Sequence, residues 1–220
     1  MKVIVFGATG MIGQGVLREC LVDPAVEEVL VVGRRSAGQR HAKLREVIYP
    51  DFSDFSALAE EFSRYDACFF CLGVSSVGMS EDAYRRVTYD ITLAAATVMA
   101  ERNPAMTFVY VSGEGSDSSE RGRVMWARVR GRTENALLRL PFHAYVIRLG
   151  YVQPLYGVAS KTRWYRGMYA VVAPAYPLLR RLLPRHVTTT ENVGKAMLAL
   201  ARRGTDAKIL YSRDVNAAAA

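Results

Sequence analysis

Cysteine is scarce in this chain of 220 residues, so a disulfide framework is not expected. The three cysteines are Cys20, Cys68 and Cys71, and this low count suits a reducing, cytoplasmic setting. Cys68 and Cys71 form a CxxC motif, but they lie in the apolar segment ACFFCLG, which is typical of a buried strand. Because no second pair of cysteines or histidines is nearby, we expect packing roles and no metal site.

Long apolar runs are also missing. No segment reaches the roughly 20 apolar residues that a helix needs to span a bilayer, so no transmembrane segment is expected. The N-terminal MKVIVFGATGMIG begins like a signal peptide, but glycines interrupt it and no cleavage pattern follows. We interpret the apolar stretch 168–183, which lies within the basic stretch 163–185, as a substrate lid or an oligomer contact. An exposed hydrophobic lobe and a peripheral membrane contact are the alternatives.

The charge balance is basic, with 29 Lys and Arg against 21 Asp and Glu and a net charge of +8. No helix-turn-helix, zinc-finger or RNA-binding signature accompanies the arginines, so nucleic acid is not an expected partner. Two interpretations of the charge stay open. One is a solvated basic surface, and the other is attraction of phosphate-bearing ligands.

Apolar segments alternate with helical patterns through the first 150 residues, which is typical of βαβ units. Because such crossovers are right-handed, the pattern predicts an α/β fold with a Rossmann-type, doubly wound parallel sheet. Strands are expected at residues 3–6, 29–32, 46–49, 67–72, 107–112 and 144–149. Helices are expected at residues 11–22, 55–64, 82–102 and 124–140. Residues 151–220 lose this rhythm, and we expect them to form a small C-terminal lobe of the same domain on the substrate side.

A glycine-rich turn, GATGMIG, follows the first expected strand and opens the first expected helix. Gly7 permits a sharp turn, Gly10 lets a pyrophosphate approach the backbone, and Gly13 lets the helix and strand pack closely. The helix N-terminus supplies free N–H groups and the positive end of a dipole for the phosphates. Residues 1–150 are therefore the expected NAD(P)-binding unit. The expected contacts in the turn are Gly7, Thr9, Gly10, Met11, Ile12 and Gly13.

The end of the second expected strand indicates which dinucleotide binds. An NAD-preferring site has an Asp or Glu there for the ribose 2′-hydroxyl, but this chain has Gly33, Arg34 and Arg35. A guanidinium can bind the extra phosphate of NADP through two hydrogen bonds and stack on adenine. We therefore predict NADP(H) in preference to NAD(H), with a surface arginine pair as the alternative interpretation.

Two further strand ends carry expected contacts with the adenosine half of the dinucleotide. Asp51 and Phe52 follow the third expected strand, and their position in the fold predicts that they flank the adenine. Leu72 and Gly73 follow the fourth expected strand and are predicted to cover the ribose. Packing within the loops is the alternative for each.

Several segments together resemble the extended and atypical short-chain dehydrogenase/reductase superfamily. They are GATGMIG, CLG, YVSGEG, VMWARVRGRTENALL and YVIRLGYVQP. The similar branch comprises NAD(P)H-binding, epimerase/dehydratase-like proteins related to the Tat-interacting oxidoreductase-like proteins, and the resemblance covers residues 1–154. It implies that Tyr151 and Val152 lie beside the nicotinamide.

The superfamily's catalytic pattern is incomplete in this chain. A Ser, together with a Tyr and a Lys in the spacing YxxxK, performs the chemistry, because residues four apart share one helix face. Ser112 is present and is the candidate to polarise a carbonyl, with a hydroxyl satisfied at the strand end as the alternative. The two helix positions hold Trp126 and Arg130, and YxxxK occurs nowhere. An indole N–H has no useful acidity. Arg130 can hold ribose hydroxyls, but it stays protonated and cannot relay protons.

Substitutes for the missing tyrosine are few. Tyr89 and Tyr151 are candidates, with packing as the alternative for both. The histidines His41, His143 and His186 show no metal or triad spacing, and we expect no catalytic role for them.

Three functions stay open at this point. The first is an NADPH-dependent oxidoreductase acting on a small carbonyl or quinone-like acceptor, with a small-molecule substrate as its partner. The second is a non-catalytic NADP(H) sensor or scaffold. The third, a sugar-nucleotide epimerase or dehydratase, follows from the resemblance, but such enzymes need the Tyr and Lys. If the protein forms an oligomer, we expect a homodimer, because two helices of such folds often pair across a dimer interface.

Overall fold

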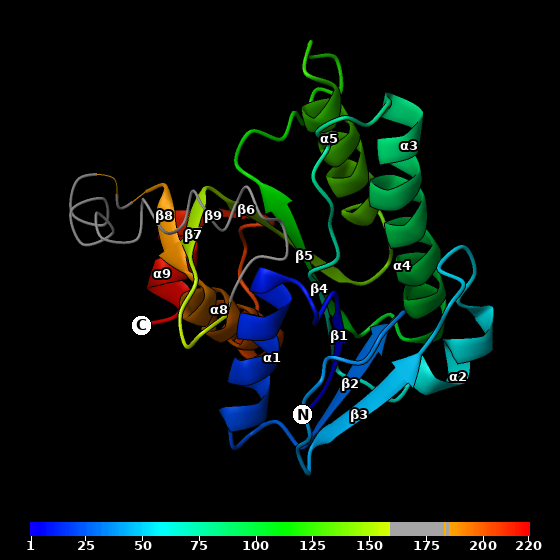
Figure 1. The fold of residues 1–220 in the computed structure, drawn as a ribbon, viewed down its shortest axis with the longest axis vertical. Coiled ribbons are helices and arrows are strands. Elements are labelled where there is room, and N and C mark those ends of the chain that lie inside the picture. The colour runs from blue at the N-terminus through cyan, green and yellow to red at the C-terminus, as the bar shows by residue number, and fades with distance from the viewer. Residues whose placement is uncertain (159–182, 184) are drawn as a thin grey trace.

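The computed structural model describes residues 1–158, 183 and 185–220, which build a parallel sheet with helices on both faces (Figure 1). The main sheet comprises β1 (Lys2–Phe6), β2 (Glu28–Gly33), β3 (Leu44–Ile48), β4 (Ala67–Phe70), β5 (Thr107–Gly113), β6 (His143–Leu149) and β9 (Ile209–Tyr211). Their order is β3-β2-β1-β4-β5-β6-β9, and all neighbours are parallel. The Rossmann-type, doubly wound prediction is confirmed. A second, two-stranded parallel sheet pairs β7 (Tyr151–Gln153) with β8 (Val187–Thr189).

Helices cover the two faces of the main sheet. One face packs against α1 (Met11–Val22), α8 (Thr190–Arg203) and α9 (Ser212–Ala218). The other face carries η1 (Ser56–Leu58), α2 (Ala59–Phe62), α3 (Glu81–Arg85), the π turn η2 (Arg86–Asp90), α4 (Ile91–Arg102) and α5 (Met125–Leu137). The central strands are therefore buried on both sides, which explains their continuous apolar sequences.

Alternate residues of each strand supply two separate apolar cores. In β1, Val3 and Val5 belong to the core under α1 and α8, whereas Ile4 and Phe6 belong to the core under α4. The cysteines follow the same rule: Cys68 is buried in the α4 core, and Cys71 packs against the other. Burial raises the pKa of the Cys68 thiol well above its ordinary range. Both thiols are free, and their surroundings fit packing roles.

The structure corrects several expected boundaries. The helix expected at residues 82–102 contains the π turn η2, because a helical apolar pattern cannot distinguish an i→i+5 turn from an α-helical one. Strand β3 begins at Leu44 instead of residue 46, and β4 ends at Phe70 instead of residue 72. Helix α5 ends at Leu137, three residues before the expected end. Strand β9 was not expected, because three residues are too short to give a recognisable pattern.

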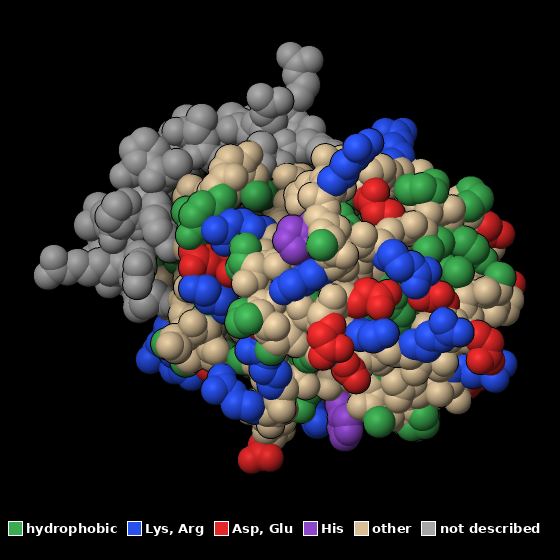
Figure 2. Space-filling view, turned by 90° about the horizontal axis from the view of Figure 1, so that it is seen from below, with side chains coloured by type: hydrophobic (Ala, Val, Ile, Leu, Met, Phe, Trp, Pro, Cys, Tyr) green, Lys and Arg blue, Asp and Glu red, His purple; other side chains and the backbone are tan. Residues whose placement is uncertain are grey.

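Charged side chains of both signs lie on the face of the molecule that is seen from below in Figure 2. Figure 2 shows Lys and Arg interspersed with Asp and Glu over this face. The excess positive charge is thus not gathered into one patch there. Among the described helices, none is long and apolar enough to cross a membrane. The basic stretch 163–185, which contains the segment interpreted above as a lid or contact, lies outside the described residues except for Leu183 and Arg185.

Candidate functional site

The turn between β1 and α1 is packed so closely that Gly7 and Gly13 cannot carry side chains. Gly7 has φ +74°, and a Cβ there would lie 2.6 Å from the Cys71 carbonyl carbon. A Cβ on Gly13 would lie 2.1 Å from the Gly7 oxygen, which explains the close contact of helix and strand. Gly10 is the N-cap of α1 and provides no capping side chain. The positive end of the helix dipole is therefore left for an anionic ligand, and this cradle fits a dinucleotide pyrophosphate.

A cavity of about 410 Å³ lies next to this turn, at the carboxyl ends of β2, β3 and β4. Its wall is largely apolar, with two guanidinium groups and one carboxylate, a composition that suits a purine nucleotide. The described lining residues are Arg34, Pro50, Phe52, Ser53, Leu72, Gly73, Val74, Arg86, Val87, Asp90 and Ile91.

Four of the expected cofactor contacts line this cavity: Arg34, Phe52, Leu72 and Gly73. The Arg34 guanidinium lies over the Phe52 ring, 5.9 Å from its centroid. Sequence reasoning missed the far wall, which comes from η2 and the first residue of α4. A π turn is common at functional sites, but its position is not readable from sequence.

Two other expected contacts, Arg35 and Asp51, are not among the described lining residues. Arg35 is exposed. The Asp51 carboxylate accepts hydrogen bonds from the Ser53 hydroxyl at 2.6 Å and the Ser53 N–H at 2.8 Å, and these bonds lower the pKa of Asp51. The carboxylate that does line the cavity, Asp90, forms an ion pair with Arg85 at 2.9 Å.

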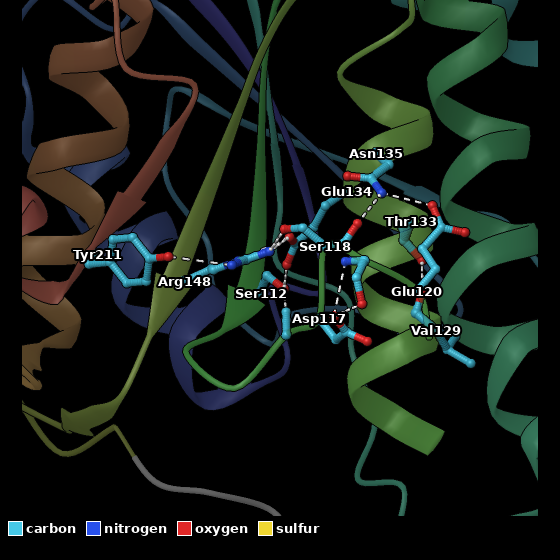
Figure 3. A network of polar contacts seen from close by, with 12 residues as sticks. Ser112, Asp117, Ser118, Glu120, Val129, Thr133, Glu134, Asn135, Arg148 and Tyr211 are labelled. Carbon is cyan, nitrogen blue, oxygen red and sulfur yellow. Dashed lines mark hydrogen bonds and ion pairs between the residues drawn. The ribbon is translucent and has the colours of Figure 1, made fainter. Parts of the chain in front are cut away.

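Ser112 lies in a buried polar network rather than on the surface of the cleft (Figure 3). Its hydroxyl donates to the Glu134 carboxylate and shares a 2.9 Å hydrogen bond with Ser116. The other oxygen of Glu134 accepts from Arg148 at 3.0 and 2.5 Å. Arg148 also contacts the Tyr211 hydroxyl at 3.4 Å. The network connects β5, α5, β6 and β9, and the Ser112 hydroxyl is used within it; a catalytic role for Ser112 stays a prediction.

Trp126 and Arg130 lie on the face of α5 that packs against the end of β5. A Cβ on Gly115 would lie 2.6 Å from the Trp126 ring carbon Cη2. A Cβ on Gly113 would lie 3.1 Å from the Arg130 Nη1. The Arg130 Nε donates to the hydroxyl of the buried Tyr84 at 2.8 Å. The structure thus brings both predicted residues beside the end of β5, together with a tyrosine that sequence reasoning missed.

The two tyrosines suggested as substitutes each contact another side chain. The Tyr89 ring faces the Arg132 guanidinium at 4.8 Å. The Tyr151 hydroxyl donates to Gln153 at 2.8 Å, and its N–H donates to the His186 carbonyl at 2.8 Å. That N–H is therefore already used in joining β7 to the residue before β8. Val152 is buried.

Metal ligands are not clustered in the part of the chain that the structure describes: no group of three or more His, Cys, Asp or Glu side chains could hold an ion there. The described polar side chains that line the cavity are those of Arg34, Arg86, Ser53 and Asp90. This set suits phosphate and ribose recognition.

Comparison with known proteins agrees with this geometry. Residues 3–118 match the sequence model of the NAD dependent epimerase/dehydratase family. The protein FMP52-1, mitochondrial, of Scheffersomyces stipitis is 26% identical over 149 residues, which cover 67% of this chain and 65% of that protein. Protein HTATIP2 of Rattus norvegicus is 28% identical over 143 residues, which cover 64% of this chain and 58% of that protein. The chain therefore matches less than two thirds of the length of these relatives. Because the fungal relative is named as mitochondrial, the cytoplasmic setting stays a prediction.

Solved structures share the fold at low sequence identity. The Bordetella bronchiseptica enzyme WbmF in complex with NAD+ superposes with a TM-score of 0.70 at 16% identity, covering 98% of this chain and 76% of that one. The UDP-glucose 4-epimerase of Thermotoga maritima superposes with a TM-score of 0.63 at 17% identity, covering 99% of this chain and 81% of that one. These likenesses establish the fold alone.

Proposed function

Because this chain belongs to the NAD dependent epimerase/dehydratase family, we propose that it is an NADP(H)-dependent oxidoreductase acting on a small carbonyl or quinone-like acceptor. The observation that carries the cofactor preference is that two arginines, Arg34 and Arg86, line the same cavity. Asp90, the carboxylate among the described lining residues, is paired with Arg85 and so repels a phosphate less.

The described residues can hold each part of NADP(H). The N-terminus of α1 takes the pyrophosphate, the cavity takes the adenosine, and Arg34 and Arg86 bind the 2′-phosphate. Arg130 lies beside the end of β5, where it can donate to ribose hydroxyls. When bound, the reduced cofactor supplies a hydride.

The proposed acceptor class follows from the missing phenol. Trp126 occupies the position of the superfamily's tyrosine and packs against Gly115, so it offers no acidic proton. A quinone takes its protons from water after the hydride arrives, and therefore does not need that tyrosine. A carbonyl acceptor needs another proton source within the cleft.

The test has two steps. Isothermal titration calorimetry compares NADPH with NADH, and tighter binding of NADPH is expected. Absorbance then follows NADPH consumption with a panel of quinones, aldehydes, ketones and flavins. Equal affinity for the two dinucleotides contradicts the cofactor preference, and NADH-driven turnover alone contradicts the proposed activity.

One observation favours a second candidate, a non-catalytic NADP(H) sensor. The Ser112 hydroxyl is held by Glu134 and Ser116, and Trp126 replaces the acidic tyrosine. NADPH binding without turnover of any acceptor in the panel would select this candidate. The search would then move from substrates to partner proteins.

A further inference from the structure

A carboxylate and an imidazole form a hydrogen-bonded pair that the proposed function does not use. The Glu114 Oε1 is bonded to the Nδ1 of His186. Their side chains are 31% and 54% exposed, so both are accessible to a small molecule, unlike the buried Ser112. We refer to these two residues as the Glu114–His186 pair.

Backbone contacts hold the pair at the carboxyl edge of the main sheet. The Glu114 N–H donates to the Leu149 carbonyl at 3.0 Å, which places Glu114 at the ends of both β5 and β6. The His186 carbonyl accepts from the Tyr151 N–H at 2.8 Å. A Cβ on Gly150 would lie 2.6 Å from the Glu114 Oε2 and 2.4 Å from the His186 oxygen. Gly150 therefore leaves the space that the pair occupies.

The position in the sheet relates the pair to the two halves of a dinucleotide. The strand order reverses between β1 and β4, and a dinucleotide crosses the sheet edge at such a point. The adenosine cavity lies at the ends of β2, β3 and β4. The nicotinamide half then falls towards β5 and β6, where the pair lies.

The pair is also next to the α5 positions that the superfamily uses for chemistry. Glu114 is flanked by Gly113 and Gly115, which pack against Arg130 and Trp126 respectively. The Glu114 side chain instead turns towards Gly150 and His186. Trp126 and the pair therefore belong to adjoining parts of one sheet edge.

We propose that His186, positioned by Glu114, donates the proton that the missing tyrosine does not supply when a carbonyl is reduced. This inference rests on the proposed function. An imidazole changes its charge near neutral pH, so it can give and regain a proton under the conditions in which the protein works. The Glu114 carboxylate accepts a hydrogen bond from Nδ1–H. A cationic His186 therefore keeps Nε2–H as the proton that it can donate.

The step balances in atoms and electrons. The carbonyl carbon receives a hydride, with its two electrons, from NADPH, which is oxidised to NADP⁺. The C=O π electrons move to the oxygen, which takes the proton from His186 Nε2 to give an alcohol. Neutral His186 then takes a proton from solvent, and a cationic imidazolium is restored beside the Glu114 carboxylate.

The first experiment uses two acceptors with different proton needs, benzaldehyde and menadione. The substitution His186→Gln is expected to lower kcat with benzaldehyde by about 10²- to 10⁴-fold. Menadione reduction and NADPH affinity should stay unchanged, because the quinone draws its protons from water. His143→Gln is the matched control, since His143 starts β6 at the opposite edge of the sheet. Equal losses with both acceptors, or no loss with benzaldehyde, overturn the proposal.

The second experiment needs no turnover. The chain has three histidines, so their ring resonances can be assigned in NMR spectra from single replacements. The resonances of His186 are expected to differ between the NADP⁺ and NADPH complexes, because the oxidised nicotinamide is positively charged. Those of His41 and His143 should not. Glu114→Gln should change the ring resonances of His186, because it removes the charged acceptor at Nδ1. It should also lower kcat with benzaldehyde and leave menadione reduction unchanged, a selectivity that a purely structural role would not produce.

The outcomes separate the two claims. Suppose that the protein turns over, but that His186→Gln leaves kcat with benzaldehyde unchanged or that the His186 resonances are the same in the two cofactor complexes. Either result overturns the proton-donor role and leaves the oxidoreductase proposal standing. Turnover with menadione but with no aldehyde or ketone also overturns the proton-donor role. NADPH binding without any turnover overturns the proposed function and the role of His186 together.

Discussion

The substitution Glu134→Ala is expected to destabilise the protein by about 3 to 5 kcal/mol, because it leaves the buried Arg148 guanidinium without the carboxylate that pairs with it. The Glu134 side chain is 0% exposed and that of Arg148 is 8% exposed, so water cannot replace the lost partner. Ser112 loses the acceptor of its hydroxyl proton in the same variant. For a chain of this length, the loss corresponds to a fall in Tm of about 6 to 20 °C.

Urea denaturation and thermal unfolding measure this effect, with two matched controls. Arg45→Ala removes the ion pairs with Glu61 and Glu28 of an arginine that is 53% exposed. Each exposed pair should cost only about 0.2 to 1 kcal/mol. The double variant Glu134→Leu with Arg148→Met should recover most of the stability, because apolar replacement removes both buried charges. A loss below about 1 kcal/mol for Glu134→Ala would refute the argument that this network stabilises the junction of β5, β6 and β9.

Three further variants test the site. Arg34→Glu should weaken NADPH binding by about tenfold to a hundredfold in calorimetry and weaken NADH binding less. An equal loss for both dinucleotides contradicts the phosphate role of Arg34. Arg35→Glu is the control, because Arg35 is not among the described lining residues of the cavity. Trp126→Phe should retain turnover, since the ring packs on a glycine backbone; a complete loss with the fold intact assigns it a direct role. Gly13→Ala should abolish dinucleotide binding or folding, because its Cβ would lie 2.1 Å from the Gly7 oxygen, and wild-type affinity in a folded variant refutes this.

Local sequence signals predicted the elements whose causes are local. Helix α1 spans Met11–Val22 as expected, because the glycine turn fixes its start and the apolar spacing fixes its length. The central strands were recognised because burial on both faces requires uninterrupted apolar residues. The edge strand β3 was displaced by two residues at its start, since its residues are only partly buried and give a weaker pattern.

The parts that sequence reasoning missed depend on contacts between distant segments. Ser112 is bound by Glu134, which is 22 residues away, and nothing near Ser112 in the sequence indicates this partner. His186 and Glu114 are 72 residues apart, and each appears ordinary alone. Arg86 reaches the cavity through a π turn, whose geometry follows from tertiary packing and not from residue type.

The late strand β9 has a consequence for how the chain folds during synthesis. It pairs with β6, and the contact between Arg148 and Tyr211 joins residues 63 apart in the sequence. Until residues 209–211 leave the ribosome, the nascent sheet presents β6 as an open edge with unpaired N–H and C=O groups. Because such an edge can recruit strands from other chains, the pairing of β9 with β6 closes one route by which the nascent protein can aggregate.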